Sequence, residues 1–205
     1  NVCRRVVDCF SSLFTGRAIA YRRRNGISHV DAGMAVVVQG MVRSKSSGVL
    51  FTANPLTGRR NESVLEAIPG LGEALVSGST EPDRYVVSRR RRRTAEDGTT
   101  AAAAADLDIR DARVGAKVRS IRPAEGGGVR EEISAEASAS PVLNEDEVKR
   151  VVEIGQEVEA LFENKPQDIE WASDGKTFFV VQSRPITTLF PLPNVPAEPL
   201  QVFFS

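Results

Sequence analysis

The sequence has little of the chemistry that several large classes of protein need. Its 205 residues include one histidine, one tryptophan and two cysteines, and 27 acidic residues balance 27 basic ones. Cys3 and Cys9 lack metal-ligand spacing, so we expect free thiols in a cytoplasmic protein. The lone His29, within GISHVDAG, is expected in a surface loop and not at a catalytic centre.

Nucleic acids and membranes are poor partners for such a chain. The one strongly basic run, SRRRRRT at 88–94, has no interleaved aromatic residue and is typical of a solvated loop. The sequence contains no apolar run of membrane-spanning length and no signal-peptide pattern. Its hydrophobic content of 41% suffices for one or two domains with a real core. We therefore expect a globular protein whose partners include neither nucleic acid nor membrane.

The spacing of apolar residues predicts an α+β chain. A long helix is expected over residues 4–25. Strands are expected at 34–41, 48–52, 63–67 and 85–87. Residues 54–58, with the sequence NPLTG, indicate a turn between two of these strands.

Further along, the pattern predicts a hairpin and a well-capped helix. Residues 114–121 and 129–133 flank a glycine-rich tip, as in a hairpin. Asn144 and Glu147 have the spacing of a capping box at the start of a helix. Lys165-Pro166 is expected to end that helix. Its apolar stripe consists of Val148, Val151, Val152, Val158, Leu161 and Phe162.

Two strand patterns near the C-terminus, QDIEW at 167–171 and FFVVQSRPIT at 178–187, are the most informative. Side chains on a strand alternate between two faces, so each pattern divides into a polar and an apolar half. The polar set is Asp168, Glu170, Gln182 and Arg184. The apolar set is Ile169, Trp171, Phe179 and Val181.

The connecting loop decides whether these sets pool. A loop of odd length places each set on one face, and a two-residue turn mixes them. We therefore predict a three-residue loop, Ser173 to Gly175, with Gly175 at positive φ. The apolar set is then buried together and the polar set faces a common cleft.

Carboxylates at alternate strand positions suit Mg²⁺, which prefers one or two carboxylates together with substrate phosphate oxygens and water. Arg184 has the planar donor fork that neutralises phosphate charge. The alternative is an exposed hairpin whose charged face only meets water. The spacing by itself leaves both interpretations open.

Several blocks, in a fixed order, resemble one known family. They are MAVVVQGMV at 34–42, SGVLFTANPLTG at 47–58, GLGEALVSG at 70–78, EPDRYVV at 81–87, QDIEW and VVQSRPIT. Together they resemble the nucleotide-binding domain of phosphoenolpyruvate synthase, pyruvate phosphate dikinase and rifampicin phosphotransferase. The resemblance implies an α+β, ATP-grasp-like fold with a mainly antiparallel sheet and packed helices, incomplete at its N-terminal lobe.

The resemblance also implies ATP and Mg²⁺ as cofactors. It makes Asp168, Glu170 and Gln182 the metal ligands and gives Glu170 and Arg184 the catalytic roles. Asp168, Gln182 and Arg184 would also lie beside the nucleotide's phosphates. His29 matches no phosphate-carrying position.

Other residues matching the family's nucleotide site lie earlier in the chain. Gln39 and Met41 match positions next to the adenine, where the backbone, including that of Val42, would meet the base edge. Glu73 is either a neighbour of the nucleotide or a favourable acid in the first turn of a helix. Both interpretations of Glu73 remain open.

The family's pattern assigns residues 1–33 to a helical entry segment from the preceding lobe and 34–188 to the C-terminal part of an ATP-grasp domain. Within it, 88–113 is a variable excursion, and 189–205 is a proline-rich interdomain linker. The phosphate-binding lysine of the preceding lobe and the swivelling domain with a phosphorylated histidine have no counterpart. We therefore expect a part of a larger enzyme that is inactive alone.

The expected function is the ATP-binding portion of a phosphoenolpyruvate synthase-like (pyruvate, water dikinase-like) phosphotransferase, which passes phosphate from ATP to a carrier histidine on another domain. One alternative is a rifampicin phosphotransferase-like enzyme. Another is a truncated, non-catalytic nucleotide-binding or scaffold protein. The acceptor is set by domains that this sequence does not include.

Overall fold

The computed structural model describes residues 2–90, 106–124, 128–133 and 140–190. Two compact units make up the chain, Asn1–Met41 and Val42–Ser205. None of the helices in the described ranges has the length and apolar character needed to cross a membrane.

The first unit starts with two short helices where one long helix was predicted. They are α1 (Val2–Ser11) and α2 (Gly16–Arg24), separated by the 3₁₀ turn η1 (Ser12–Phe14). Thr15 causes the break, because its backbone is extended and its hydroxyl accepts a hydrogen bond from the Ala18 N–H as an N-cap. The capping signal is visible in the sequence, but apolar periodicity alone overlooks it.

Residues 34–41 form no strand, so that prediction is wrong. In the described part of the chain this segment pairs with no other strand. Its large apolar side chains, among them Val37 and Met41, are exposed. An apolar run is buried only where another element covers it, and the described residues of this unit offer no sheet. His29 is exposed in a loop, and Cys3 and Cys9 are exposed free thiols, as predicted.

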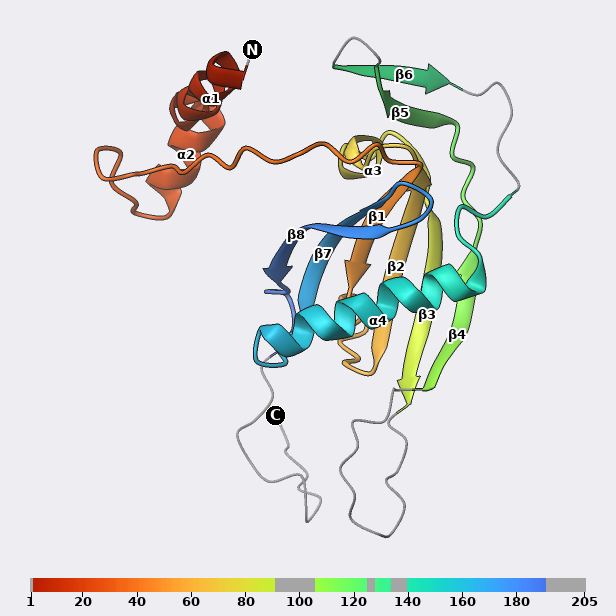
Figure 1. The fold of residues 1–205 in the computed structure, drawn as a ribbon. Helices are drawn as coiled ribbons and strands as arrows, with labels where there is room; N and C mark the ends of the chain where they lie inside the picture. The colour runs from red at the N-terminus through yellow and green to blue at the C-terminus, as the bar shows by residue number, and fades with distance from the viewer. Residues whose placement is uncertain (1, 91–105, 125–127, 134–139, 191–205) are drawn as a thin grey trace, which may run out of the picture. The chain divides into compact units, whose positions relative to one another are not determined.

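The second unit is built on a six-stranded antiparallel sheet with the strand order β4-β3-β2-β1-β7-β8 (Figure 1). Its strands are β1 (Ser46–Phe51), β2 (Glu62–Pro69), β3 (Asp83–Arg90), β4 (Asp106–Arg113), β7 (Gln167–Ser173) and β8 (Phe178–Pro185). The strands predicted at 48–52, 63–67 and 85–87 are confirmed as β1, β2 and β3. Because β1 pairs with β7, the C-terminal hairpin completes one side of the sheet, with β7 inside the sheet and β8 at its edge.

β4 lies inside the stretch 88–113 that the resemblance makes a variable excursion, and residues 106–113 of that stretch form a regular strand. Leu107 and Ile109 alternate along β4 and pack against the core. Because this one face packs against the core, the segment forms an edge strand of the sheet although most of its other residues are polar. Ser88–Arg90 belong to β3, and the rest of the basic run lies outside the described residues.

Helix α4 (Glu145–Leu161) crosses one face of the sheet (Figure 1). The predicted capping box is confirmed: the Asn144 side chain accepts from the Glu147 N–H at 2.9 Å, and Glu147 accepts from the Asn144 N–H at 2.9 Å. The helix ends at Leu161, four residues before Lys165, because Glu163 and Asn164 both adopt left-handed conformations.

The core lies between α4 and the sheet. Val148, Val151 and Val152 of the predicted stripe are buried against Leu50 and Ile169 of the strands, and Val158 is partly buried. The end of the stripe was predicted wrongly, since Leu161 is 82% exposed and Phe162 is 47% exposed. The other face of the sheet, which α4 does not cover, is called the open face below.

A second, two-stranded sheet pairs β5 (Arg119–Pro123) with β6 (Val129–Ile133), which confirms the predicted hairpin, although its first strand begins at Arg119 and not at residue 114. Its tip, 125–127, lies outside the described residues. The short helix α3 (Glu73–Val76) follows β2. A hydrogen bond of 2.7 Å from the Leu71 N–H to the Ile121 carbonyl ties the glycine-rich segment before α3 to β5.

Candidate functional site

Strands β7 and β8 bring the whole polar set to the open face, as predicted. Asp168 lies directly opposite Arg184 in the ladder, and the other two members of the set also face each other. The intervening side chains Ile169 and Trp171 point to the α4 side, where they are 1% and 3% exposed. Gln182 is therefore on the face opposite to Trp171.

The structure reaches this arrangement by a different route from the predicted one. The loop has four residues, Asp174 to Thr177, where three were predicted. Gly175 has φ +89°, as predicted. A loop of even length would set the two halves of the polar set on opposite faces, but a β-bulge corrects this: Glu170 pairs with Gln182 while Trp171 pairs with Val180, which leaves Val181 as the extra residue.

The bulge also changes which apolar side chains are buried. Phe178 packs edge-on against Trp171, with ring centroids 5.7 Å apart. Phe179 and Val181 are 38% and 37% exposed, so their predicted burial is wrong. Between the loop and the bulge, each side chain of β8 lies on the face opposite to the one predicted: Phe178 and Val180 share the face of Trp171, and Phe179 lies on the other face.

An ion pair anchors one end of the polar set. Arg184 Nε donates to Asp168 Oδ2 at 2.8 Å. The hydrogen bond and the charge of Asp168 raise the pKa of Arg184. Burial lowers this pKa by a smaller amount, and the charge of Glu170 makes the smallest contribution, which raises it. Arg184 remains 66% exposed at its side chain and Asp168 only 12%. The guanidinium is thus held at the surface by a mostly covered carboxylate.

Glu170 and Gln182 form the second pair. They lie opposite each other one step further along the ladder. Neither side chain makes a hydrogen bond or ion pair with any other residue in the described ranges. A carboxylate and an amide oxygen that are both unengaged fit a Mg²⁺ ion, which takes one or two carboxylates and completes its shell with phosphate oxygens and water. The described residues contain no cluster of three or more His, Cys, Asp or Glu side chains suited to a metal.

Neighbouring strands extend the open face around the polar set. Phe51 on β1 lies opposite Asp168, and Val49 lies between Glu170 and Glu66. Glu66 in turn lies opposite Arg84 on β3. The sequence patterns identify β1 and β2 but not their register, so these neighbours could not be assigned before the sheet order was known.

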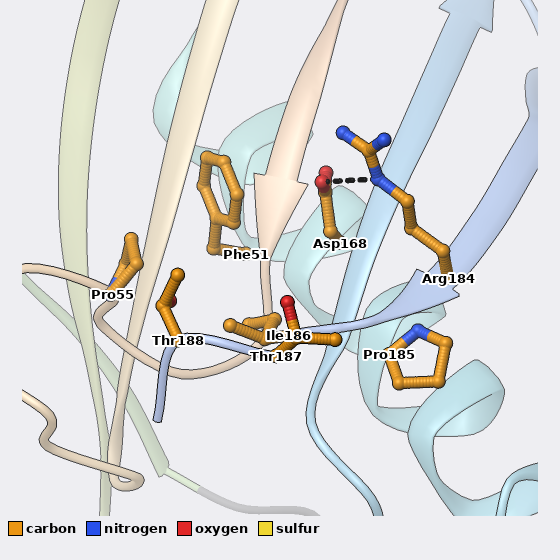
Figure 2. A pocket seen from close by; sticks show the side chains of 8 residues that line it. All are labelled: Phe51, Pro55, Asp168, Arg184, Pro185, Ile186, Thr187 and Thr188. Atoms are coloured by element: carbon orange, nitrogen blue, oxygen red, sulfur yellow. Dashed lines mark hydrogen bonds and ion pairs between the residues drawn. The ribbon is translucent and has the colours of Figure 1, made fainter. Parts of the chain in front are cut away.

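A pocket of about 550 Å³ opens beside the ion pair (Figure 2). It is lined by Phe51, Pro55, Asp168, Arg184, Pro185, Ile186, Thr187 and Thr188. The volume falls within the range of small-molecule sites, about 300–1,000 Å³. The end of β8 and the segment that follows it, residues 185–188, pass beneath the ion pair in Figure 2 and form the floor of the pocket. The sequence patterns did not predict this part of the site.

The turn at residues 54–58 supports the far wall of this pocket. The Asn54 side chain accepts hydrogen bonds from the Leu56 and Thr57 N–H groups at 3.1 and 3.2 Å. It also donates to Glu62 at 3.0 Å, and Glu62 pairs with Arg59 at 2.7 Å. These bonds fix the turn that carries Pro55, so the wall is preformed.

The structure does not bring Glu73 to the ion pair. Glu73 is exposed in the first turn of α3, as one of the two interpretations expected. The segment before α3 follows Pro69, which pairs with Ser46, whereas Asp168 pairs with Phe51 at the other end of β1. Five residues of strand span about 16 Å.

Gln39 and Met41 lie in the first unit and are exposed. They belong to the segment that was predicted as a strand and is not one. Their assignment to the adenine position stays a prediction.

Known proteins match this chain along most or all of its length. A family model described as pyruvate phosphate dikinase, AMP/ATP-binding domain, matches residues 1–195. Rifampicin phosphotransferase of a Streptomyces species is 42% identical over 206 residues, covering 100% of this chain and 22% of the relative. Probable phosphoenolpyruvate synthase of Archaeoglobus fulgidus is 40% identical over 189 residues, covering 92% of this chain and 23% of the relative. Rifampicin phosphotransferase of Bacillus subtilis is 38% identical over 205 residues, covering 100% of this chain and 22% of the relative.

The chain spans less than a quarter of the length of these relatives. The matched residues include every strand of the open face and the whole polar set. The α+β architecture with a mainly antiparallel sheet agrees with a partial ATP-grasp-like fold. From the match over residues 1–195, the chain belongs to the pyruvate phosphate dikinase AMP/ATP-binding domain family.

Proposed function

We propose that this chain is the ATP-binding portion of a phosphoenolpyruvate synthase-like phosphotransferase, and that the open face at β7 and β8 binds the phosphates of ATP. The observation that carries the proposal is the polar set itself. A fixed, exposed guanidinium stands beside an unengaged carboxylate and amide, at the mouth of a preformed pocket. Planar donors and hard oxygen ligands are the groups that polyphosphate with its metal requires.

In this proposal Glu170 and Gln182 would hold Mg²⁺; the sequence resemblance also names Asp168 as a ligand, a role that is revised below. When bound, the metal would neutralise charge on the phosphate oxygens. Arg184 contacts the same phosphates as a planar fork and stabilises the charge that spreads over the transferring group. Phosphoryl transfer depends mainly on positioning and electrostatics, so this small set of side chains is proposed to supply part of the phosphate end of the site.

The remainder of the site is proposed from the family's pattern. Gln39 and Met41 would lie along the adenine and Glu73 near the nucleotide. A preceding lobe with a phosphate-binding lysine and a swivelling domain with a carrier histidine would complete the machinery, and residues 189–205 would link to the latter. The chain alone is then inactive, and the whole enzyme works in the cytoplasm.

A rifampicin phosphotransferase-like enzyme is the second candidate. It is favoured by the 42% identity of the Streptomyces relative across the whole chain. A phosphoenolpyruvate synthase matches at 40%, so identity does not separate the two. The acceptor, pyruvate in one case and an antibiotic hydroxyl in the other, is chosen by parts of the enzyme outside this chain.

Glu170→Ala in the full-length protein tests the proposal. We expect ATP-driven phosphotransfer to fall by roughly two to three orders of magnitude, because a charge-stabilising group at the transferring phosphate is lost. Glu157→Ala is the matched control, since Glu157 is an exposed acid on α4, across the sheet. Near-normal turnover in Glu170→Ala would contradict the assignment. Absence of ATP turnover in the parent protein itself would favour a non-catalytic scaffold.

A further inference from the structure

We infer that Asp168 is a positioning residue that aims the Arg184 guanidinium at the phosphates, and that it is not a metal ligand. This inference rests on the proposed function and changes the role of one residue within it. It leaves Glu170 and Gln182 as the protein ligands of the metal.

The geometry of the ion pair is the first observation. Asp168 Oδ2 accepts from Nε of Arg184, at 2.8 Å, and not from a terminal amino group. No residue in the described ranges accepts a hydrogen bond from either terminal nitrogen of Arg184. In Figure 2 the one dashed line between the two side chains starts at Nε, and none starts at a terminal nitrogen. The carboxylate therefore fixes the plane of the guanidinium while leaving its two-pronged end free for an anion.

The two side chains of the ion pair differ in their exposure to solvent. Arg184 is 66% exposed and Asp168 is 12% exposed. Asp168 lies between Phe51 on β1 and Arg184 on β8, and it lines the pocket next to the guanidinium that it orients. A metal that carries phosphates and water needs an accessible ligand, whereas a group that only orients its neighbour does not.

With Asp168 paired to Arg184, Glu170 and Gln182 remain as a sufficient set of protein ligands for the metal. Mg²⁺ is usually bound by one or two carboxylates together with substrate oxygens. Glu170 and Gln182 are unengaged and adjacent in the ladder, and they provide one carboxylate and one amide oxygen. An exposed arginine without a partner samples many rotamers, so fixing it in advance reduces what is lost on binding phosphate.

The two roles give opposite results when metal is absent. Removing a negative charge beside a phosphate should by itself strengthen binding of an anion. Removing the group that orients Arg184 should weaken it. Binding of ATP and of inorganic triphosphate in EDTA, measured by calorimetry on the full-length protein, therefore separates them by sign.

We expect Asp168→Ala to bind both probes about tenfold more weakly in EDTA, because one charge-assisted hydrogen bond that orders the fork is lost. Asp168→Asn keeps an acceptor for Nε and should bind within about twofold of the parent. In an Arg184→Ala background, Asp168→Ala should cause no further loss. Glu170→Gln should bind both probes at least as tightly as the parent in EDTA, because it removes a negative charge beside the phosphates, and more weakly than the parent with Mg²⁺.

Unchanged or tighter binding by Asp168→Ala in EDTA, with a loss only when Mg²⁺ is present, would show a metal ligand and overturn the inference. Equal losses in Asp168→Asn and Asp168→Ala would also overturn it. If the parent binds neither probe with or without Mg²⁺, the proposed function fails as well. The two failures are thereby distinguished.

Discussion

The hydroxyl of Tyr85 lies inside the core, where it donates a hydrogen bond to the Leu143 carbonyl oxygen at 3.3 Å. Burial, together with the negative charge of Asp83, raises the pKa of Tyr85 from 10 to about 12. The folded state thus favours the protonated phenol more than the unfolded state does. The resulting stability is present below pH 10 and is lost as the pH rises towards 12.

This shift predicts a late component in an alkaline absorbance titration of tyrosinate. The Tyr85→Phe variant should lose a component centred near pH 12, and the Tyr21→Phe variant should keep it. Tyr21 is the suitable control because it is exposed. A Tyr85→Phe titration identical to that of the parent above pH 11 would mean that the phenol is not held in the core as described.

At the scale of elements, the contact between α4 and β1 depends on one glycine. Gly155 is buried on the helix face towards the sheet. A Cβ at this position would lie 2.3 Å from Leu50 Cδ2 and 3.3 Å from Thr52 Cγ2. A side chain at position 155 would therefore fit only if the buried Leu50 side chain moved.

Gly155→Ala should destabilise the protein by about 1–3 kcal/mol, the usual cost of overpacking a dense core. Helix propensity alone predicts the opposite sign, a gain of up to about 1 kcal/mol. Urea unfolding of Gly155→Ala, alone and in a Leu50→Ala background, measures the difference. If the contact is as described, the penalty shrinks once Leu50 is truncated. Stabilisation by Gly155→Ala in the parent background would contradict the packing.

The elements that the sequence predicts well are those whose signals are local. The capping box at Asn144 and the alternation in β7 depend on residues a few positions apart. The prediction of a strand at 34–41 was wrong because an apolar run indicates burial but does not identify the element that would cover it. β4 was missed because most of its residues are charged, and only Leu107 and Ile109 give an apolar signal for the face that packs against the core.

The candidate site shows the same division. The polar set was found from alternation, and its common face is confirmed. The parity argument behind it was incomplete, because the bulge at Val181 has no local signal and offsets an even loop. Phe51 and the floor formed by residues 185–188 were not predicted, since they join the site only through sheet order and the path of the chain after β8.

At the scale of the whole unit, a buried ion pair joins three distant segments. Asp83 on β3 pairs with Lys117, and both side chains are at most 1% exposed. Asp83 also accepts from the Gly115 N–H at 2.9 Å and from the Val142 N–H at 2.6 Å. The Asp83 carboxylate, at the start of β3, thus holds in place both the segment that leads into β5 and the segment that leads into α4.

Lys117→Met should destabilise the protein by about 3–5 kcal/mol, because it leaves the Asp83 charge buried without its partner. Arg119→Met is the control, since the Arg119–Glu131 pair is about half exposed and such pairs contribute about 0–1 kcal/mol. Urea unfolding at neutral pH measures both variants. A Lys117→Met cost no larger than that of Arg119→Met would show that the pair does not organise the unit.

The central claim is that the open face at β7 and β8 binds the phosphates of ATP. The most direct measurement is a crystal structure of the full-length protein with ATP and Mg²⁺. We predict phosphate oxygens within hydrogen-bond distance of the terminal nitrogens of Arg184, and a metal about 2.0–2.1 Å from a Glu170 carboxylate oxygen. ATP bound elsewhere, with Arg184 and Glu170 in contact with neither phosphate nor metal, would contradict it.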